Sequence, residues 1–266
     1  MYETFFGLKE KPFNVTADPS FFFMSKRHKE ALSHMIYGIE QRKGIISITG
    51  EIGTGKTTLC RVLLNSLDKK IRSAFILNPN FSSLELLHII VEDFGIYPSK
   101  KSKVSLVSDL NNFLIKESQK NHNVVLIIDE SQNLDPSQLE QIRLLTNLET
   151  AKEKLLQIIL VGQPELKEKL ELPNLKQLCQ RIAVKYHILP LDNEELADYI
   201  KHRLDVAGSN GDLKFNGDAL GQIYNSSKGI PRMINIICDR ALLAAFVEEK
   251  KEIDGSLIEK AMQELK

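Results

Sequence analysis

The sequence predicts an α/β domain built on a parallel five-stranded sheet flanked by helices, followed by a small all-α domain. Three observations lead to this prediction: short apolar runs alternate with longer helical patterns up to about residue 190, most of these runs are continuous, and helical patterns alone follow. Strands separated by helices indicate a parallel sheet with crossovers, and continuous apolar runs suit strands covered on both faces. We therefore expect domains at residues 1–190 and 191–266.

Five apolar runs are the expected strands. The strongest is NVVLIIDE, in which five apolar residues are closed by two acids, whereas the fifth run, VKYHILPL, alternates. The expected strands span residues 44–50, 73–79, 123–130, 156–164 and 184–191, and the expected helices include 26–42, 56–68, 83–94, 105–120, 136–148 and 174–181.

After Pro190 the pattern becomes helical. DNEELADYIKHRLDVAG opens with acids and closes with glycine, which are helix start and stop signals. Three further helical patterns follow in NGDALGQIYNSSKG, IPRMINIICDRALLAAFVEEK and DGSLIEKAMQELK, and we expect no strand in this region.

Composition narrows the classes of function. The chain has 266 residues, of which 42% are hydrophobic and 26% are charged, as is typical of a globular protein. Its 35 basic residues balance 35 acidic ones, so it lacks the basic excess of a dominant nucleic-acid binder. No apolar run reaches the roughly 20 residues that span a bilayer, and the N-terminus lacks the order of a signal peptide, so we expect a cytoplasmic chain.

The cysteines and histidines predict neither a zinc site nor a disulfide. Cys60, Cys179 and Cys238 are far apart, and none forms a C-x-x-C pair. We therefore expect buried reduced thiols. The six histidines show no metal-ligand spacing, which favours surface or packed histidines.

The stretch GEIGTGKTT fits the pattern G-x-x-x-x-G-K-[ST] between an expected strand and an expected helix. Its glycines let backbone N–H groups point toward phosphates, and the helix N-terminus adds the positive end of its dipole. Lys56 would neutralise the β- and γ-phosphates, and Thr57 would offer a hydroxyl to Mg²⁺. We call this segment the lysine loop; its expected nucleotide-binding residues are Gly50, Glu51, Ile52, Gly53, Thr54, Gly55, Lys56, Thr57 and Thr58.

The acids of VVLIIDE supply the second half of the expected site. An acid at the carboxyl end of a strand lies where open α/β sheets bind ligands, so Asp129 would hold Mg²⁺ through its water shell. Glu130 would polarise the attacking water as general base. A small-molecule kinase would also have a lysine loop, but a base that activates water favours hydrolysis. The alternative is that both acids merely cap the next helix.

Hydrolysis also needs positive charge at the terminal phosphate as the bond breaks. Arg181 and Arg232 are the main candidates, and Arg143 ranks below Arg181 because a helix-surface arginine usually forms a salt bridge. Arg232 occupies the first turn of a helix, where the dipole disfavours a cation, so a nearby anion would explain it. A surface arginine lying along the helix is the equally weighted alternative. Gln163 would orient the lytic water, although a turn residue before Pro164 is the more ordinary interpretation.

The segments GEIGTGKTT, VVLIIDE, ILVGQPEL, LCQRI and GIPRMIN resemble, in this order, those of the P-loop AAA+ ATPases. More narrowly, the chain resembles the ATPase domain of the general secretion pathway protein A family, and its relatives in type IV pilus assembly and in exosortase or exopolysaccharide loci. The opening MYETFFGLKEKPFNV and the later DPSFFFMSKRHKEALSHMIYGI match the N-terminal signature of that family. The resemblance covers essentially the whole chain and implies an AAA+ core followed by a helical lid.

The resemblance implies that the chain binds ATP and Mg²⁺. The lysine loop would be the Walker A loop, and Asp129 and Glu130 would be the Walker B pair. Gln163 would stand at sensor 1, a position that more often holds Asn, Ser or Thr in AAA+ proteins.

The resemblance also implies a homo-oligomer, such as a hexameric ring. Arg181 would be the finger that enters a neighbouring subunit's site, Arg232 would be sensor 2 in the lid, and residues 28–32 would lie near the adenine. The family often continues into a transmembrane helix and a periplasmic peptidoglycan-binding domain, which this sequence lacks. We therefore expect either a short member or an excised cytoplasmic domain, brought to the inner-membrane face by a partner or by residues absent here.

Three functions compete at this point. The first is an oligomeric ATPase that supports assembly of an envelope secretion, pilus or polysaccharide-export complex with an inner-membrane partner. The second is an ATP-dependent DNA loader or transposition-type regulator, which the balanced charge disfavours although Lys100, Lys101 and Lys103 form a local basic cluster. The third is a nucleotide-gated binding switch with negligible turnover.

Overall fold

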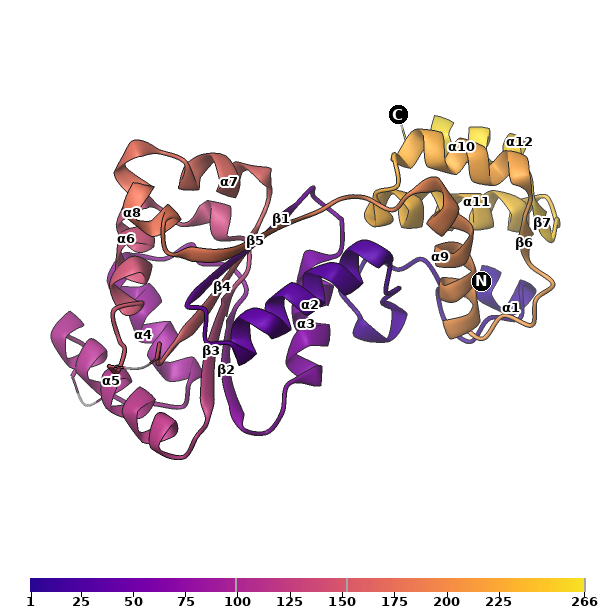
Figure 1. Cartoon of the computed structure of the whole chain (residues 1–266). Helices are drawn as coiled ribbons and strands as arrows, with labels where there is room; N and C mark the ends of the chain where they lie inside the picture. Colours follow the sequence, from indigo (N-terminus) through magenta and orange to yellow (C-terminus); the bar gives the residue numbers. More distant parts are fainter. Residues whose placement is uncertain (99, 152, 266) are drawn as a thin grey trace. The chain divides into compact units, whose positions relative to one another are not determined.

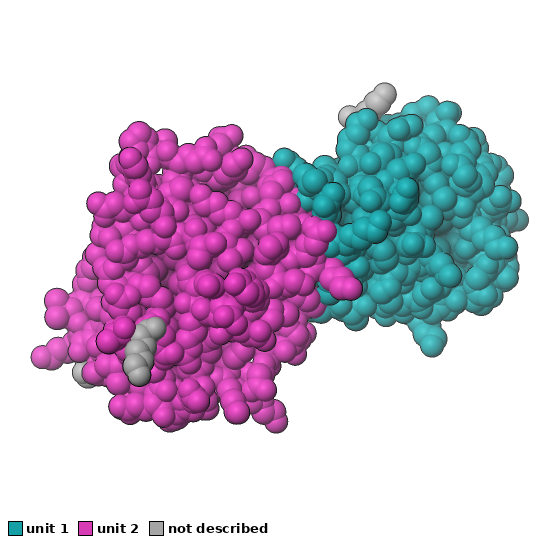
Figure 2. All heavy atoms as spheres, in the orientation of Figure 1, with its two compact units in different colours: residues 1–28, 51–59, 189–266 teal, residues 29–50, 60–188 magenta. Residues whose placement is uncertain are grey.

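The computed structural model of the chain describes residues 1–98, 100–151 and 153–265. It divides into two compact units, which Figure 2 colours separately. We call residues 29–50 and 60–188 the sheet unit, and residues 1–28, 51–59 and 189–266 the helical unit. The expected domain boundary at residue 190 stays a prediction, and these units differ from it mainly by placing the first 28 residues with the helices that follow residue 189.

The sheet unit contains the five expected strands, all parallel, and the predicted fold class is confirmed. Their order across the sheet is β2-β3-β4-β1-β5 (Figure 1). The second and fifth strands begin two residues earlier than expected, because the ends of elements are the part least determined by a local pattern. The strands are β1 Ile45–Gly50, β2 Ile71–Ile76, β3 Asn123–Ile128, β4 Gln157–Gly162 and β5 Ile182–Ile188.

Helices cover both faces of this sheet. In Figure 1, α4, α5 and α6 lie on one side of the strands, and α2 and α3 lie on the other. β1 and β4 are buried along their whole length, as expected for strands between two helical layers. The helices are α2 Lys26–Glu40, α3 Lys56–Ser66, α4 Ser83–Asp93, α5 Lys103–Gln119 and α6 Pro136–Leu145.

The segments beside β4 and β5 differ from expectation. The helix α7 Pro164–Leu170 was not expected, because its seven residues give only a short pattern and Pro164 suggested a turn. Proline in fact suits the first position of a helix, where its missing N–H is not needed. The helix expected at residues 174–181 is a 3₁₀ turn, η3 Pro173–Leu175, followed by a single α-helical turn, α8 Lys176–Cys179. Another 3₁₀ turn, η2 Ser131–Asn133, follows the acids after β3.

The carboxyl ends of the strands lie along one edge of the sheet, because all five strands are parallel. This edge carries Gly50, where the lysine loop begins, and Asp129 and Gln163, which directly follow β3 and β4. Since β3 and β4 are neighbours in the sheet, the topology places the predicted acids beside the predicted sensor residue.

The helical unit contains the four helices expected after residue 190. They are α9 Asn193–Val206, α10 Gly217–Ser227, α11 Pro231–Val247 and α12 Gly255–Gln263. The expectation that this region has no strand is wrong, since β6 Lys214–Phe215 and β7 Glu252–Ile253 form a short parallel pair. Two residues are too few to produce the period on which a strand prediction depends.

The N-terminal residues belong to the core of the helical unit. They form α1 Tyr2–Phe5 and the 3₁₀ turn η1 Pro19–Phe21, and their aromatic side chains share an apolar cluster with α9 to α12. Arg203 of α9 holds the connecting chain: its Nε donates to the Pro12 carbonyl at 2.6 Å and its Nη2 to the Asn14 carbonyl at 2.8 Å. Its guanidinium also lies 4.7 Å from the centre of the Phe21 ring.

The three cysteines are free thiols. Cys60 and Cys238 are buried as expected, but Cys179 is only partly buried. Burial raises the pKa of the Cys238 thiol, which keeps it protonated. Among the described residues, none of the helices has both the length and the apolar character needed to cross a membrane.

Candidate nucleotide-binding site

The lysine loop joins the end of β1 to the start of α3, which is the strand–loop–helix context that its motif requires. Gly53 has a φ of +82°, a left-handed conformation that glycine adopts without steric cost. Lys56 is buried, and its Nζ donates to the Glu51 carbonyl at 2.9 Å. Thr54 Oγ1 donates to the same carbonyl at 2.8 Å, so two hydrogen bonds close the loop around one oxygen.

A buried histidine holds the loop from another side. His28 Nε2 lies 2.8 Å from the Thr54 carbonyl oxygen, and its Nδ1 lies 2.7 Å from Ser25 Oγ. A carbonyl can only accept, so Nε2 carries the proton and Nδ1 accepts from the serine hydroxyl. Burial lowers the pKa of His28 and so favours the neutral ring. The family resemblance implied that residues 28–32 lie near the adenine, and this contact was not expected, because nothing in the spacing of the histidines indicates it.

Arg232 lies against the lysine loop within the helical unit. It is the second residue of α11, after Pro231, and its backbone N–H donates to the Gly53 carbonyl at 3.2 Å. A Cβ added to Gly53 would lie 2.6 Å from the Cβ of Arg232. The first turn of α11 is therefore packed on the loop, and the exposed Arg232 side chain starts beside it. Whether that side chain serves a γ-phosphate stays a prediction.

The acidic pair begins one residue after β3. Asp129 is buried, and its backbone N–H donates to the Ile76 carbonyl, at the end of β2, at 2.8 Å. The Glu130 N–H donates to Asp129 Oδ1 at 2.9 Å. Glu130 has a φ of +51°, and a left-handed conformation costs a residue with a Cβ roughly 1–2 kcal/mol. An uncommon backbone conformation at the ligand-binding edge of a sheet supports a functional role for Glu130.

Two side-chain amides converge on the Glu130 carboxylate. Gln132 Nε2 donates to Glu130 Oε2 at 2.5 Å, and Gln163 Nε2 donates to the same oxygen at 3.2 Å. The Gln163 backbone N–H in turn donates to Gln132 Oε1 at 3.1 Å. The predicted sensor residue thus contacts the predicted base. Sequence reasoning missed Gln132, because its approach to β4 depends on how the η2 turn is placed in the fold.

Two of the predicted γ-phosphate arginines lie together in the sheet unit. Arg181 Nη1 donates to Thr146 Oγ1 at 2.8 Å and to the Arg143 carbonyl at 3.2 Å. The Arg143 guanidinium forms two hydrogen bonds with Glu140, at 2.6 and 2.7 Å. Arg143 therefore makes the salt bridge expected of a helix-surface arginine. The role of Arg181 as a finger stays a prediction.

Comparison with known proteins identifies a domain and a similar protein. A family model described as an AAA domain matches residues 39–170. The general secretion pathway protein A of Aeromonas hydrophila is 45% identical over 254 residues, which cover 95% of this chain. Residues 39–170 therefore carry an AAA domain, and the chain as a whole is similar to general secretion pathway protein A. The chain spans 46% of the length of that relative.

Solved structures share the fold of this chain. The ORC2 protein of Aeropyrum pernix, in a structure of its ADPNP–ADP complexes, has 17% identity and a TM-score of 0.64, covering 91% of this chain and 67% of that one. Cdc6p from Pyrobaculum aerophilum has 18% identity and a TM-score of 0.68, covering 92% and 70%. The RuvB Holliday junction branch migration motor of Thermotoga maritima has 18% identity and a TM-score of 0.59, covering 90% and 68%.

The types of donor group among the predicted metal-binding residues fit magnesium. Within the described residues there is no group of three or more His, Cys, Asp or Glu side chains that could hold a metal ion together. Magnesium, however, is commonly bound by one or two carboxylates together with substrate phosphates and waters. Thr57 in the first turn of α3 offers a hydroxyl, and Asp129 offers a buried carboxylate, which are both ligand types that magnesium accepts. That the two residues hold one ion stays a prediction.

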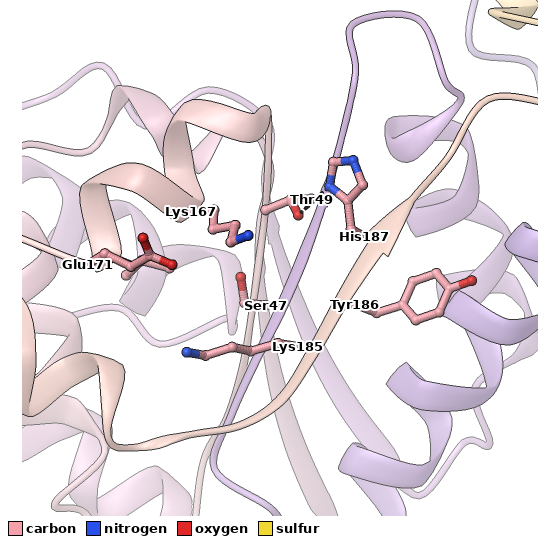
Figure 3. A pocket seen from close by; sticks show the side chains of 8 residues that line it. Ser47, Thr49, Lys167, Glu171, Lys185, Tyr186 and His187 are labelled. Carbon is pink, nitrogen blue, oxygen red and sulfur yellow. Dashed lines mark hydrogen bonds between the residues drawn. The ribbon is translucent and has the colours of Figure 1, made fainter.

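A separate pocket of about 200 Å³ lies in the sheet unit beside α7, β1 and β5 (Figure 3). Figure 3 shows His187 directed toward Thr49, and its Nδ1 lies 2.9 Å from Thr49 Oγ1. None of the described residues predicted for the nucleotide site is among those that line it. The lining consists of Ser47, Thr49, Lys167, Leu170, Glu171, Lys185, Tyr186 and His187.

Proposed function

We propose that the chain hydrolyses ATP with Mg²⁺, and that it works as an oligomer that supports assembly of a bacterial envelope secretion, pilus or polysaccharide-export complex. One observation supports hydrolysis most directly: Glu130 follows β3 in an uncommon backbone conformation, and its carboxylate accepts hydrogen bonds from two side-chain amides. A general base must point in a fixed direction toward water, whereas a site that only grips phosphates has no need of one.

Each residue then has a defined task. The backbone N–H groups of the lysine loop bind the phosphates, and Lys56 neutralises charge on the β- and γ-phosphates. Glu130 takes a proton from the attacking water, which Gln163 helps to orient. Thr57 and Asp129 would hold Mg²⁺, which when bound would help to neutralise the charge of the phosphates.

The substitution Glu130→Gln tests the proposed hydrolysis. It should preserve ATP binding and lower the rate of phosphate release by about 10²- to 10⁴-fold, because it removes the general base but no phosphate contact. A matched control is Glu168→Gln, which changes an exposed glutamate on α7 in the same way. Phosphate release by Glu130→Gln at the wild-type rate would exclude Glu130 as the base.

The proposed oligomer brings Arg181 of one subunit to the nucleotide of the next. Arg181→Ala and Glu130→Gln should each have little turnover alone. Mixing them at a constant total concentration should restore part of the activity, since some mixed interfaces combine an intact Glu130 with an intact Arg181. If no mixing ratio restores activity, the finger does not act between subunits.

The assembly role is supported by the similarity to general secretion pathway protein A. We place the chain in the cytoplasm, at the inner-membrane face through a partner. The Glu130→Gln variant, which should retain ATP, is suited to capturing that partner from solubilised membranes with and without ATP. ATP-dependent recovery of envelope-complex proteins is the expected result. Salt-sensitive DNA binding that ATP strengthens, with no such recovery, would instead favour the DNA-loader alternative.

A further inference from the structure

We propose that Gln132 is a positioning residue for ATP hydrolysis, and that it fixes the Glu130 carboxylate to the end of β4. This inference rests on the proposed function, in which Glu130 is the general base. Gln132 is the middle residue of η2, two positions after Glu130, and its side chain lies between that carboxylate and the backbone of the neighbouring strand's end.

The amide of Gln132 uses its two ends for two different partners. Its Nε2 donates to Glu130 Oε2 at 2.5 Å, and its Oε1 accepts the backbone N–H of Gln163 at 3.1 Å. Rotating this side chain would break both bonds, so the amide sets the place of the carboxylate relative to the end of β4. A hydrogen bond to an ionised carboxylate is roughly twice as strong as one between neutral groups. Gln132 therefore holds Glu130 more firmly than the flexible glutamate side chain alone would allow.

The two amides bind the same oxygen of the Glu130 carboxylate, which leaves the other oxygen for catalysis. Gln132 and Gln163 both donate to Oε2 of Glu130. We assign the other carboxylate oxygen, Oε1, to the attacking water. In this arrangement Gln132 does not touch the water itself, and it acts on the reaction through the direction in which Glu130 points.

The surroundings of Gln132 are built to keep its amide in place. Lys169 of α7 donates to the Leu134 carbonyl at 2.8 Å and also to the Gln132 carbonyl, which pins the η2 turn to α7. A Cβ added to Gly162, the last residue of β4, would lie 2.8 Å from Gln132 Oε1. The absence of a side chain at this position is what lets the amide reach the strand end.

Two substitutions of Gln132 separate its donor from its acceptor. Gln132→Met has a similar length and loses both hydrogen bonds. Gln132→Glu keeps an acceptor for the Gln163 N–H, but it replaces the donor with an oxygen that repels Glu130. The control is Asn133→Asp, which adds a negative charge one residue further on, at an exposed position. For each variant, kcat and KM for ATP, the equilibrium affinity for a fluorescent ATP analogue, and the melting temperature are measured at one pH.

We expect kcat to fall by about 10- to 100-fold in both Gln132 variants, as for a general base that is present but misplaced. The affinity for the analogue should stay within about twofold of wild type, because no phosphate contact is lost. Gln132→Glu should lose at least as much kcat as Gln132→Met, and Asn133→Asp should match wild type.

A purely structural role predicts a different result. If Gln132 only supports the backbone of Gln163, then Gln132→Glu keeps the acceptor and should turn over ATP at the wild-type kcat, which would overturn the inference. If the wild-type chain hydrolyses ATP and Gln132→Met has the same kcat, the inference is also overturned, while the proposed function stands. A wild-type chain that releases no phosphate at any concentration would refute the proposed hydrolysis and the inference with it.

Discussion

Replacing Gly53 with alanine should break the packing between the lysine loop and the first turn of α11. Two effects act together. Gly53 has a φ of +82°, and the added Cβ would lie 2.6 Å from the Cβ of Arg232 and 3.3 Å from Cγ2 of Ile230. The closest atom is fixed to a helix backbone, so it cannot move aside as the end of a long side chain could. Either the loop or the helix must shift.

The magnitude of this effect follows from those two terms. The left-handed conformation costs an alanine roughly 1–2 kcal/mol. Forcing a methyl group into a filled site typically costs about 1–3 kcal/mol more. The sum is about 2–5 kcal/mol of unfolding free energy. At about 2–4 °C for each kcal/mol, the melting temperature should fall by roughly 4–20 °C.

A second glycine of the helical unit serves as a control that separates the cost of the steric clash from the cost of the left-handed backbone. Gly211 has a φ of +89°, and no atom of the residues that the structure describes lies within 4 Å of a Cβ added there, so Gly211→Ala carries the backbone cost alone. Thermal and urea unfolding of both variants should show that Gly53→Ala is less stable than Gly211→Ala by about 1–3 kcal/mol. ATP affinity should fall only in Gly53→Ala. Equal stability of the two variants would refute the packing of α11 on the loop.

Three further predictions concern the stability of the two units. Burial lowers the pKa of His28 in the folded chain, so the unfolded chain binds a proton at this histidine more readily. The free energy of unfolding should therefore fall as the pH drops below the pKa of the unfolded histidine, about 6.5. His28→Gln should accordingly lose less melting temperature than wild type between about pH 7.5 and about pH 5.5. Arg203→Met should leave the Pro12 and Asn14 carbonyls without their donor. Limited proteolysis should then cut the N-terminal segment around these two residues faster than in wild type. An unchanged rate of cleavage would contradict the role given to Arg203. Leu126→Ala, in the buried strand β3, should cost about 2–5 kcal/mol in urea unfolding, against less than about 0.5 kcal/mol for the partly exposed Leu84→Ala.

The arrangement of strands and helices was predictable because its signals are local. β1, β3 and β4 are buried on both faces, and burial on both faces requires the continuous apolar runs that the sequence displays. The elements that were missed are short: α7 has seven residues, and β6 and β7 have two each. Such elements form because neighbouring parts of the fold hold them, and their own residues carry little periodicity.

The sequence by itself determined the lysine loop and the acidic pair, since each is a run of adjacent residues that follows a recognisable strand. Tertiary structure alone decided which distant groups meet these segments: Gln132 and Gln163 on Glu130, His28 on the Thr54 carbonyl, and the start of α11 on Gly53. A motif is encoded in neighbouring positions, whereas these contacts depend on how loops, turns and the strand order bring separate segments to one edge. For that reason candidate residues for the chemistry, Gln163 among them, could be named from the sequence, but the contacts that these residues make could not.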